Sequence, residues 1–437
     1  MDPTICETCG TDEPPSPPPQ RVRAAVFFDG TGNNRVNARA RSTDHVGFER
    51  NLPASTASYE SAPSNIAKGE EEMGQYRDVE NVGQHYYIEG IGTQTDGRDI
   101  PEGMSLGTGI TGVMAKMRAG LDQLVSDISQ LDPARPIEKV EIDTFGFSRG
   151  AAAARHFVHV ALNDRALNVR KQLEDRGFTV NDVTVTFVGL YDTVASYGVQ
   201  HSNDTRDLNL DAIRNAEYTF QLAAGDEHRA NFRLTDIRSA PAGKQIFLPG
   251  VHSDIGGGYN DHGRESDHQV VDLDWRGLVR RSADLASLER ERNWLIQRGW
   301  YTERELSQPN YAWEILGNRR NIRNTYANLA LNMMADEAVA HGVPFSPELS
   351  AFHPIPRDAI VTRVKALIDA SVAAGNVAKG DAYKDYWLQM SEPSLNAVRH
   401  KYFHMSSRYG ESAGAHAPNY TAHPSDGGVR RRVVQRG

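Results

Sequence analysis

Short apolar runs alternate with amphipathic segments along the first 260 residues of the chain. Runs rich in β-branched and aromatic residues are typical of buried strands, and apolar side chains at helical spacing indicate the helices between them. The pattern predicts strands at 21–28, 85–91, 139–147, 184–190 and 245–251, helices at 113–131 and 149–162, and mostly loop over 35–80. Strands separated by helices form parallel βαβ units, so we expect an α/β fold with a mostly parallel sheet flanked by helices.

The pattern changes near residue 265, where charged, amphipathic segments with few β-branched runs begin. Such segments favour helices, which we expect at 275–299, 302–317, 322–341 and 357–375. The sequence therefore predicts three parts. They are a disordered Pro-rich tail over 1–20, an α/β core over 21–264 and a mainly helical cap or accessory region over 265–437.

A Gly-x-Ser-x-Gly sequence, Gly146 to Gly150, lies directly between a predicted strand and a predicted helix. In that context the central Ser148 stands on a sharp turn, and the glycines allow the strand and the helix to approach each other closely. The turn places the hydroxyl at a helix N-terminus, where free N–H groups favour developing negative charge. We therefore predict that Ser148 is a nucleophile; the alternative is an ordinary Gly-flanked turn of a βα unit.

A serine hydroxyl is a weak nucleophile that needs a base oriented by an acid. In proteins with this turn the chain order is serine, acid, histidine. Asp192 follows the strand at 184–190, and His252 follows the strand at 245–251. Since open parallel sheets form their sites at the carboxyl ends of strands, we predict Asp192 as the acid and His252 as the base.

Other residues compete for these two roles. Asp254, two residues beyond His252, is either a rival acid or a brace for the Gly-rich segment that follows it. His400 and His404 become rival bases if the C-terminal segment folds back. No predicted strand delivers these histidines, so we expect them to serve packing or a helix end.

An oxyanion that forms on the substrate needs two backbone N–H donors. We expect one from Arg149, next to the nucleophile, and the other from Gly30 or Thr31 in the turn after the first strand, where glycine permits close approach. The alternative is a tight turn without a ligand. Asp29 in this turn either anchors the loop or holds a cation together with Asn33, and the sequence leaves both roles open.

Composition narrows the possible partners. The chain has 437 residues, 48 basic and 57 acidic, with a formal charge of −9, which argues against broad binding to nucleic acid or to an anionic membrane by charge. No run of 18 apolar residues occurs, so we expect no transmembrane helix. The N-terminus has neither the basic nor the apolar region of a secretory signal.

Two short motifs give only weak indications of a ligand site. Cys6 and Cys9, the only cysteines, have the spacing of half a zinc site, but no second pair of ligands lies near them, so we predict no metal site. The sequence Gly107-x-Gly109-x-x-Gly112 has the spacing of a dinucleotide fingerprint. That fingerprint must directly follow a strand, and the preceding segment is polar, so we interpret it as a loop that caps a helix.

The segments FFDGTGNN, GFSRGAAAAR, VGLYDTVAS and LPGVHSDIGGGY occur in this order between residues 22 and 260. Together they resemble the α/β-hydrolase domain of bacterial type VI secretion lipase effectors, in the group that includes phospholipases A. The resemblance implies an α/β-hydrolase-like fold, with Ser148 as nucleophile, Asp192 as acid and His252 as base. It further implies activity on membrane glycerophospholipids. We expect no cofactor, because a Ser-His-Asp mechanism requires no calcium, and the Asp- and Gly-rich loops leave a structural cation open.

The family also implies a route and partners. Such effectors are made in the cytoplasm of the producing bacterium, travel on a spike protein to the periplasm of a rival cell, and are blocked by an immunity protein in the producer. Two other functions stay open from the residues alone. One is a soluble serine esterase or thioesterase on small substrates without a secretion role, and the other is a catalytically vestigial binding or delivery module.

Overall fold

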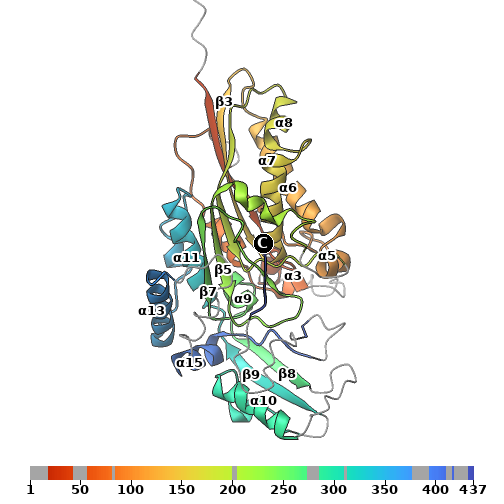
Figure 1. Cartoon of the computed structure of the whole chain (residues 1–437), viewed down its shortest axis with the longest axis vertical. Helices are drawn as coiled ribbons and strands as arrows, with labels where there is room; N and C mark the ends of the chain where they lie inside the picture. The colour runs from red at the N-terminus through yellow and green to blue at the C-terminus, as the bar shows by residue number, and fades with distance from the viewer. Residues whose placement is uncertain are drawn as a thin grey trace, which may run out of the picture.

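The computed structural model, drawn in Figure 1, describes most of the chain. The described residues are 18–42, 57–80, 84–198, 204–272, 285–309, 313–375, 393–409, 416–417 and 432–437. The predicted tail over 1–20, with Cys6 and Cys9, lies outside these residues except for its last three positions. Among the helices of the described ranges, none has the length and hydropathy needed to cross a bilayer.

Six parallel strands form the central sheet, in the order β2-β1-β3-β4-β5-β7. They are β1 (Gln20–Phe28), β2 (His85–Ile88), β3 (Ile137–Phe147), β4 (Val183–Tyr191), β5 (Ala216–Ala224) and β7 (Gly243–Leu248). The five predicted strands are all present. Strand β5 escapes the hydrophobic pattern because its Thr219 and Gln221 are polar although fully buried. The Gln221 amide is satisfied by the side chain of Gln245 at 2.6 Å and the carbonyl of Thr235 at 3.0 Å.

The sheet is covered on both faces. Neighbouring strand residues point to opposite sides, so Val26 joins one apolar core and Phe27 joins the other. Figure 1 shows α6 and α7 on one side of the sheet and α11 on the other, where α4 also packs. This arrangement confirms the predicted α/β fold. The bounds are α4 (Asn65–Glu71), α6 (Val113–Ile128), α7 (Arg149–Asn163) and α11 (Ala327–Ala340).

The part after residue 264 is mainly helical, as predicted, but it also contains an antiparallel pair of strands, β8 (Gly263–Asp272) and β9 (Glu314–Ile322). The predicted boundary at 264/265 falls inside β8. The predicted helix over 302–317 is wrong, because this stretch holds a 3₁₀ turn, η4 (Glu303–Glu305), and the start of β9. Arg319 of β9 is buried and paired with Glu265 of β8 at 2.8 Å. Because these charged residues lie inside the strand pair, the hydrophobic pattern of the segment is typical of an amphipathic helix and not of a strand.

The C-terminal part is continuous with the core. Helix α11 packs on β4 and β5, and the last strand, β10 (Val434–Gln435), pairs with β6 (Leu234–Thr235). Figure 1 marks the end of the chain over the middle of the molecule. The other helices here are α10 (Leu285–Gln297), α12 (Leu349–Phe352), α13 (Ala359–Ala373) and α15 (Pro393–Tyr402).

Several short elements connect the layers. In the described parts of the segment predicted as mostly loop over 35–80 lie the short helices α1, α3 and α4. Gly107, in the left-handed region with φ 70°, ends α5, and Gly112 caps α6, so the interpretation of the Gly-rich stretch as a helix-capping loop is confirmed. The short elements are α1 (Arg35–Ser42), α3 (Ala57–Glu60), α5 (Pro101–Leu106), η1 (Gly109–Thr111), α8 (Val169–Glu174), η2 (Leu210–Asn215) and α9 (His252–Gly256).

Candidate active site

Ser148 occupies the turn between β3 and α7, with φ 59° and ψ −127°. A residue with a side chain rarely adopts such a positive φ, and the strain costs on the order of 1–3 kcal/mol. The two glycines of the motif make the turn possible. A Cβ on Gly146 would lie 2.5 Å from the Ala151 Cα, and one on Gly150 would lie 2.3 Å from the Asp29 carbonyl oxygen. The backbone therefore presents Ser148 in the strand–turn–helix context that the motif predicts.

Asp192 and His252 form a buried hydrogen-bonded pair. His252 Nδ1 lies 2.6 Å from Asp192 Oδ2, and both side chains are almost completely buried. Asp192 stands directly after β4, and its other carboxylate oxygen accepts a hydrogen bond from the Ala224 amide at 2.9 Å. A carboxylate at Nδ1 fixes the tautomer of the imidazole, because it holds the proton on Nδ1 and leaves Nε2 as an acceptor.

Ser148 lies against this pair through its chain neighbours. Its amide donates to the carbonyl of Tyr191, the residue before Asp192, at 3.0 Å. The ring of Phe147, the residue before the serine, packs on the His252 ring with 4.6 Å between the centroids. The structure thus brings the three predicted residues to the edge of the sheet where β3, β4 and β7 end.

Further buried charges surround the pair. Arg432 Nη2 donates to both carboxylate oxygens of Asp192, at 3.1 and 3.2 Å, and its Nη1 donates to the Glu227 carbonyl at 3.4 Å. The Glu227 carboxylate accepts hydrogen bonds from the Arg229 guanidinium at 2.9 and 3.0 Å and from the His252 amide at 3.3 Å.

These additional residues were not predicted from the sequence. Glu227 and Arg229 follow β5, so recognition of that strand would have placed them at the same edge as the predicted site residues. Arg432 lies 240 positions from its partner Asp192, and no local pattern signals the contact.

Burial and the neighbouring charges act in opposition on the ionisation of this cluster. The pKa of His252 is lowered from 6.5, mainly because burial disfavours the imidazolium; Asp192 acts in the opposite direction, and Arg229 lowers the pKa further. Burial also disfavours a charged Glu227, but Arg229, Arg432 and His252 outweigh it and hold the pKa of Glu227 well below its usual range. The lowered pKa of His252 favours the neutral imidazole that a general base requires.

The turn after β1 lies beside the start of α7 and offers candidate oxyanion donors. Among the described residues, no hydrogen bond engages the amide of Arg149 or of Thr31. The Gly30 amide instead donates to the Asp29 carboxylate at 2.7 Å, which favours Thr31 over Gly30 as the second donor. Arg149 Nε donates to Thr31 Oγ1 at 2.8 Å and so ties the two favoured candidates together.

Asp29 anchors this turn. Its carboxylate accepts hydrogen bonds from the hydroxyls of Ser64 and Tyr87, both at 2.6 Å, in addition to the Gly30 amide. Burial raises the pKa of Asp29 to about 6, and these donors oppose the rise. Of the two roles open to Asp29, the structure supports the anchor, and no cluster of His, Cys, Asp or Glu suited to a metal ion occurs among the described residues.

The rival residues have other partners. Asp254 accepts from the Val251 amide at 3.0 Å and pairs with His404, whose Nδ1 lies 2.9 Å from Asp254 Oδ1. His400 pairs with Glu305 at 2.9 Å. Among the described residues, no hydrogen bond or ion pair joins Asp254, His400 or His404 to the Asp192–His252 pair, which agrees with the expectation that these histidines serve packing.

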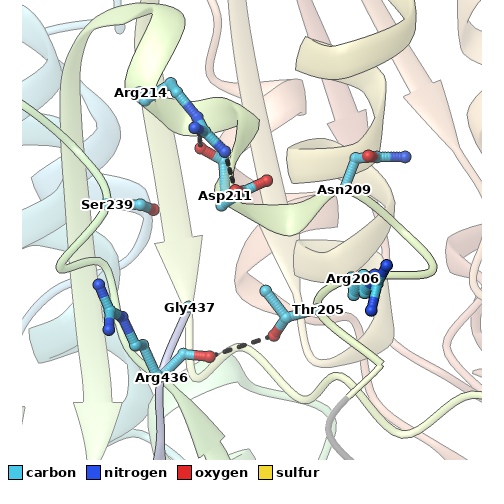
Figure 2. A pocket seen from close by; sticks show the side chains of 8 residues that line it. All are labelled: Thr205, Arg206, Asn209, Asp211, Arg214, Ser239, Arg436 and Gly437. Carbon is cyan, nitrogen blue, oxygen red and sulfur yellow. Dashed lines mark hydrogen bonds and ion pairs between the residues drawn. The ribbon is translucent and has the colours of Figure 1, made fainter.

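The hollow in Figure 2 is a different place from this site. It has a volume of about 670 Å³ and is lined by the residues labelled there, among them Arg206, Arg214 and Arg436. None of the predicted site residues lines it. A second hollow of about 410 Å³ borders Arg229 and His404 but not Ser148.

Comparisons with known proteins agree with the motifs. Residues 161–277 match the family model described as the catalytic domain of Tle1-like phospholipase effectors of the type VI secretion system. A solved structure, of "the Tle1 effector bound to the VgrG spike from the Type 6 secretion system", is 22% identical, aligns with a TM-score of 0.64, and is covered over 99% of its length by 100% of this chain. No curated protein matches the chain significantly.

A further solved structure is less similar. It is an uncharacterized protein from Pseudomonas aeruginosa that is 18% identical, with a TM-score of 0.43, and the match spans 84% of this chain and 52% of that one. The fold comparison rests on the first structure alone. The family model over residues 161–277 and the shared fold confirm the resemblance that the motifs indicate: the chain is similar to the Tle1-like phospholipase effectors of the type VI secretion system.

Proposed function

We propose that the chain is a serine esterase that cleaves acyl esters of membrane glycerophospholipids, with Ser148 as nucleophile, His252 as general base and Asp192 as the residue that orients it. The observation that carries the proposal is the buried Asp192–His252 hydrogen bond of 2.6 Å beside a serine held on a strained strand–helix turn. The match of residues 161–277 to a phospholipase catalytic domain supports the substrate class.

The reaction follows from the geometry in two halves. In the first, the Ser148 hydroxyl oxygen attacks the ester carbonyl carbon, and its proton passes to His252 Nε2 while Asp192 stabilises the imidazolium through Nδ1. The tetrahedral intermediate then expels the glycerol oxygen, which takes the proton from Nε2 and leaves as a lysophospholipid. In the second half, a water molecule gives a proton to His252 and attacks the acyl-serine, which releases a fatty acid and restores Ser148.

The amides of Arg149 and Thr31 supply the oxyanion donors in this scheme. Both are free of hydrogen bonds within the described residues, and the Arg149 amide opens α7, where the helix dipole favours negative charge. Removal of a single oxyanion donor costs about 10²- to 10³-fold in rate in serine hydrolases.

An apolar surface near this turn favours a lipid over a small ester. The Arg149 guanidinium donates to the carbonyls of residues 103–105 and so holds α5 and the turn η1 after it beside the serine. Beyond α5, Ile110 is 75% exposed, and Met114 one turn further on is 43% exposed. Exposed apolar side chains on a segment that is fastened to the residue after the serine are suited to contact with acyl chains at a membrane surface.

Delivery on a spike protein to the periplasm of a rival cell, and inhibition by an immunity protein, are part of the same proposal. The supporting observations are the family match and the similarity along the whole chain to an effector solved in complex with its VgrG spike. A pull-down of this chain with the spike protein from the same bacterium tests the first of these partners; absence of binding would count against the delivery route and leave the ester chemistry untouched.

Lipid mass spectrometry tests the reaction itself. Glycerophospholipid vesicles are incubated with the wild-type chain and with Ser148→Ala, and lysophospholipid and fatty acid are quantified. We expect both products with the wild type alone. Equal products from the two proteins would overturn the role of Ser148, and intact vesicles with the wild type would overturn the substrate class.

Substitution of Ile110 separates the lipid esterase from the soluble esterase. Ile110→Asp should slow hydrolysis of vesicles about tenfold while hydrolysis of a dispersed p-nitrophenyl ester stays unchanged, since only the vesicle requires surface contact. Phe352→Asp is the matched control, because Phe352 is also exposed, at 62%, but lies on α12. An equal response of both substrates to Ile110→Asp would favour the soluble esterase.

A further inference from the structure

The last six residues of the chain pack along β6, with Arg432 and Gly437 buried and Arg436 exposed. Strand β10 lies parallel to β6, where the Leu234 amide donates to the Val433 carbonyl at 2.9 Å and the Asp236 amide to the Gln435 carbonyl at 3.0 Å. Figure 2 shows the next anchor, the hydrogen bond of 3.2 Å from the Thr205 hydroxyl to the Arg436 carbonyl. The segment is thus fixed by backbone bonds on both sides of β10.

This anchoring presents Arg432 to the Asp192 carboxylate. The Arg432 side chain is 1% exposed, the Asp192 side chain is fully buried, and two hydrogen bonds join them. Taking a carboxylate out of water is costly unless a cation and hydrogen bonds compensate for the lost hydration. Arg432 therefore gives Asp192 a partner that does not depend on the state of His252.

Within the described hydrogen-bonded cluster next to His252, the charges balance. Asp192 follows β4, Glu227 and Arg229 follow β5, and Arg432 comes from the C-terminal segment, which makes two carboxylates and two guanidiniums. The aromatic rings that pack on His252, those of Phe147 and Phe232, carry no charge. Removal of Arg432 would leave a net negative cluster against the imidazole.

From this arrangement we propose that Arg432 is a positioning residue that holds the Asp192 carboxylate in place and offsets its charge, so that the C-terminal segment is an integral part of the catalytic centre. The proposal rests on the function proposed above. An uncompensated Asp192 would bind the proton on His252 too tightly. Less neutral base would then be present near pH 7, and the proton would return more slowly to the leaving oxygen.

A titration of His252 tests the charge directly, without any substrate. In the Ser148→Ala background, the imidazole signal of His252 is followed by NMR with ¹³C-labelled histidine and assigned with a His252 variant. Adding Arg432→Gln should raise the pKa of His252 by about one unit, because a nearby positive charge is lost. Arg436→Gln, which removes an exposed arginine from the same segment, should leave it unchanged. An unchanged titration with Arg432→Gln overturns the proposal.

Kinetics on a dispersed p-nitrophenyl ester test the positioning role. Arg432→Gln should lower kcat about 10- to 100-fold with a smaller change in KM, and should move the acidic limb of kcat/KM to higher pH. Guanidinium added at millimolar concentration should restore part of the rate. A variant that loses thermal stability but keeps the wild-type pH profile and kcat per folded molecule would show a merely structural role and contradict the proposal.

Arg432→Lys keeps the test open if the glutamine variant does not fold. Lysine retains the charge but not the two-point contact, so we expect an unmoved acidic limb with kcat reduced about tenfold. A wild-type kcat in Arg432→Lys contradicts the positioning role. A wild-type enzyme that hydrolyses no ester overturns the proposed function instead, and the NMR titration still decides the fate of the Arg432 proposal.

Discussion

Two buried aspartate–histidine pairs involve the short helix α9, which supplies His252 to one pair and Asp254 to the other. In both, a carboxylate oxygen meets Nδ1 of the imidazole, at 2.6 Å in Asp192–His252 and at 2.9 Å in Asp254–His404. Both pairs are almost fully buried, and both join residues far apart in the chain. By hydrogen-bond geometry alone, either pair resembles the acid and base of a hydrolase.

The surroundings of Nε2 separate them. His404 stacks on Tyr259 with 3.8 Å between the ring centroids, and its Nε2 is buried against Gly263, with no hydrogen-bond partner among the described residues. His252 instead packs on Phe147, directly before the serine of the turn. The Asp254–His404 pair fastens the C-terminal segment to α9, and the Asp192–His252 pair is the one that we propose serves the reaction. A histidine acts as a base only where its free nitrogen can reach a proton that must move.

The largest expected difference between the pairs is in the loss of kcat/KM when each histidine is replaced. His252→Ala should lower kcat/KM for ester hydrolysis by about 10⁴-fold or more, because it removes the base. His404→Ala should change kcat/KM per folded molecule by less than about tenfold. Both are measured with a p-nitrophenyl ester after correction for the folded fraction, and an equal loss in the two variants would remove the distinction between the pairs.

The second largest difference should be in the loss of kcat when each aspartate is replaced. Asp192→Asn keeps the size of the side chain but favours the wrong tautomer of His252, so we expect a loss of about 10³- to 10⁴-fold in kcat. Asp254→Asn is the matched control and should stay within about tenfold of the wild type. Steady-state kinetics at pH 8 distinguish the two, and a larger loss in Asp254→Asn would reverse the assignment of the acid.

For the free energy of unfolding we expect the opposite order, with the larger loss in His404→Ala. His404→Ala leaves the buried Asp254 carboxylate without its ring partner and should lower the free energy of unfolding by about 3 kcal/mol. His252→Ala should cost only about 1 kcal/mol, since Asp192 keeps its hydrogen bonds from Arg432 and Ala224. Urea denaturation measures both values. A greater cost for His252→Ala would mean that Arg432 does not support Asp192.

The smallest expected effect is on the pH profile. Because burial lowers the pKa of His252 from 6.5, the neutral base persists at pH 6.5, and the acidic limb of kcat/KM should fall below that pH. Activity is then lost as the pH drops through the lowered value. His404→Ala should leave this limb in place within about 0.2 unit. A limb above pH 6.5 in the wild type would contradict the effect of burial.

The sequence indicates well which residues gather at the candidate site, because each follows a strand whose hydrophobic run is easy to recognise. Ser148, Asp192 and His252 are placed by β3, β4 and β7, all of which are predicted. The sequence pattern does not predict β5 and β9, two strands that contain buried polar residues. Thr219 and Gln221 conceal β5, and Arg319 paired with Glu265 makes β9 resemble a helix.

The sequence also does not predict contacts between residues that lie far apart in the chain. No pattern near Arg432 indicates that it meets Asp192, and nothing near Asp254 indicates that it meets His404 rather than His252. Local sequence shows which residues stand at a strand end, whereas the partner of a buried charge depends on how the whole chain folds. The Gly30 amide illustrates the same limit, since its engagement by Asp29 depends on the side-chain conformation in the turn.

Covalent labelling of the serine tests the central claim most directly. The wild-type chain, His404→Ala and His252→Ala are treated with a fluorophosphonate probe, and the labelled peptide is identified by mass spectrometry. We predict rapid labelling on Ser148 in the wild type and in His404→Ala, with labelling at least about 100-fold slower in His252→Ala. Labelling at another residue, or equal labelling of Ser148 in the two histidine variants, would contradict the account.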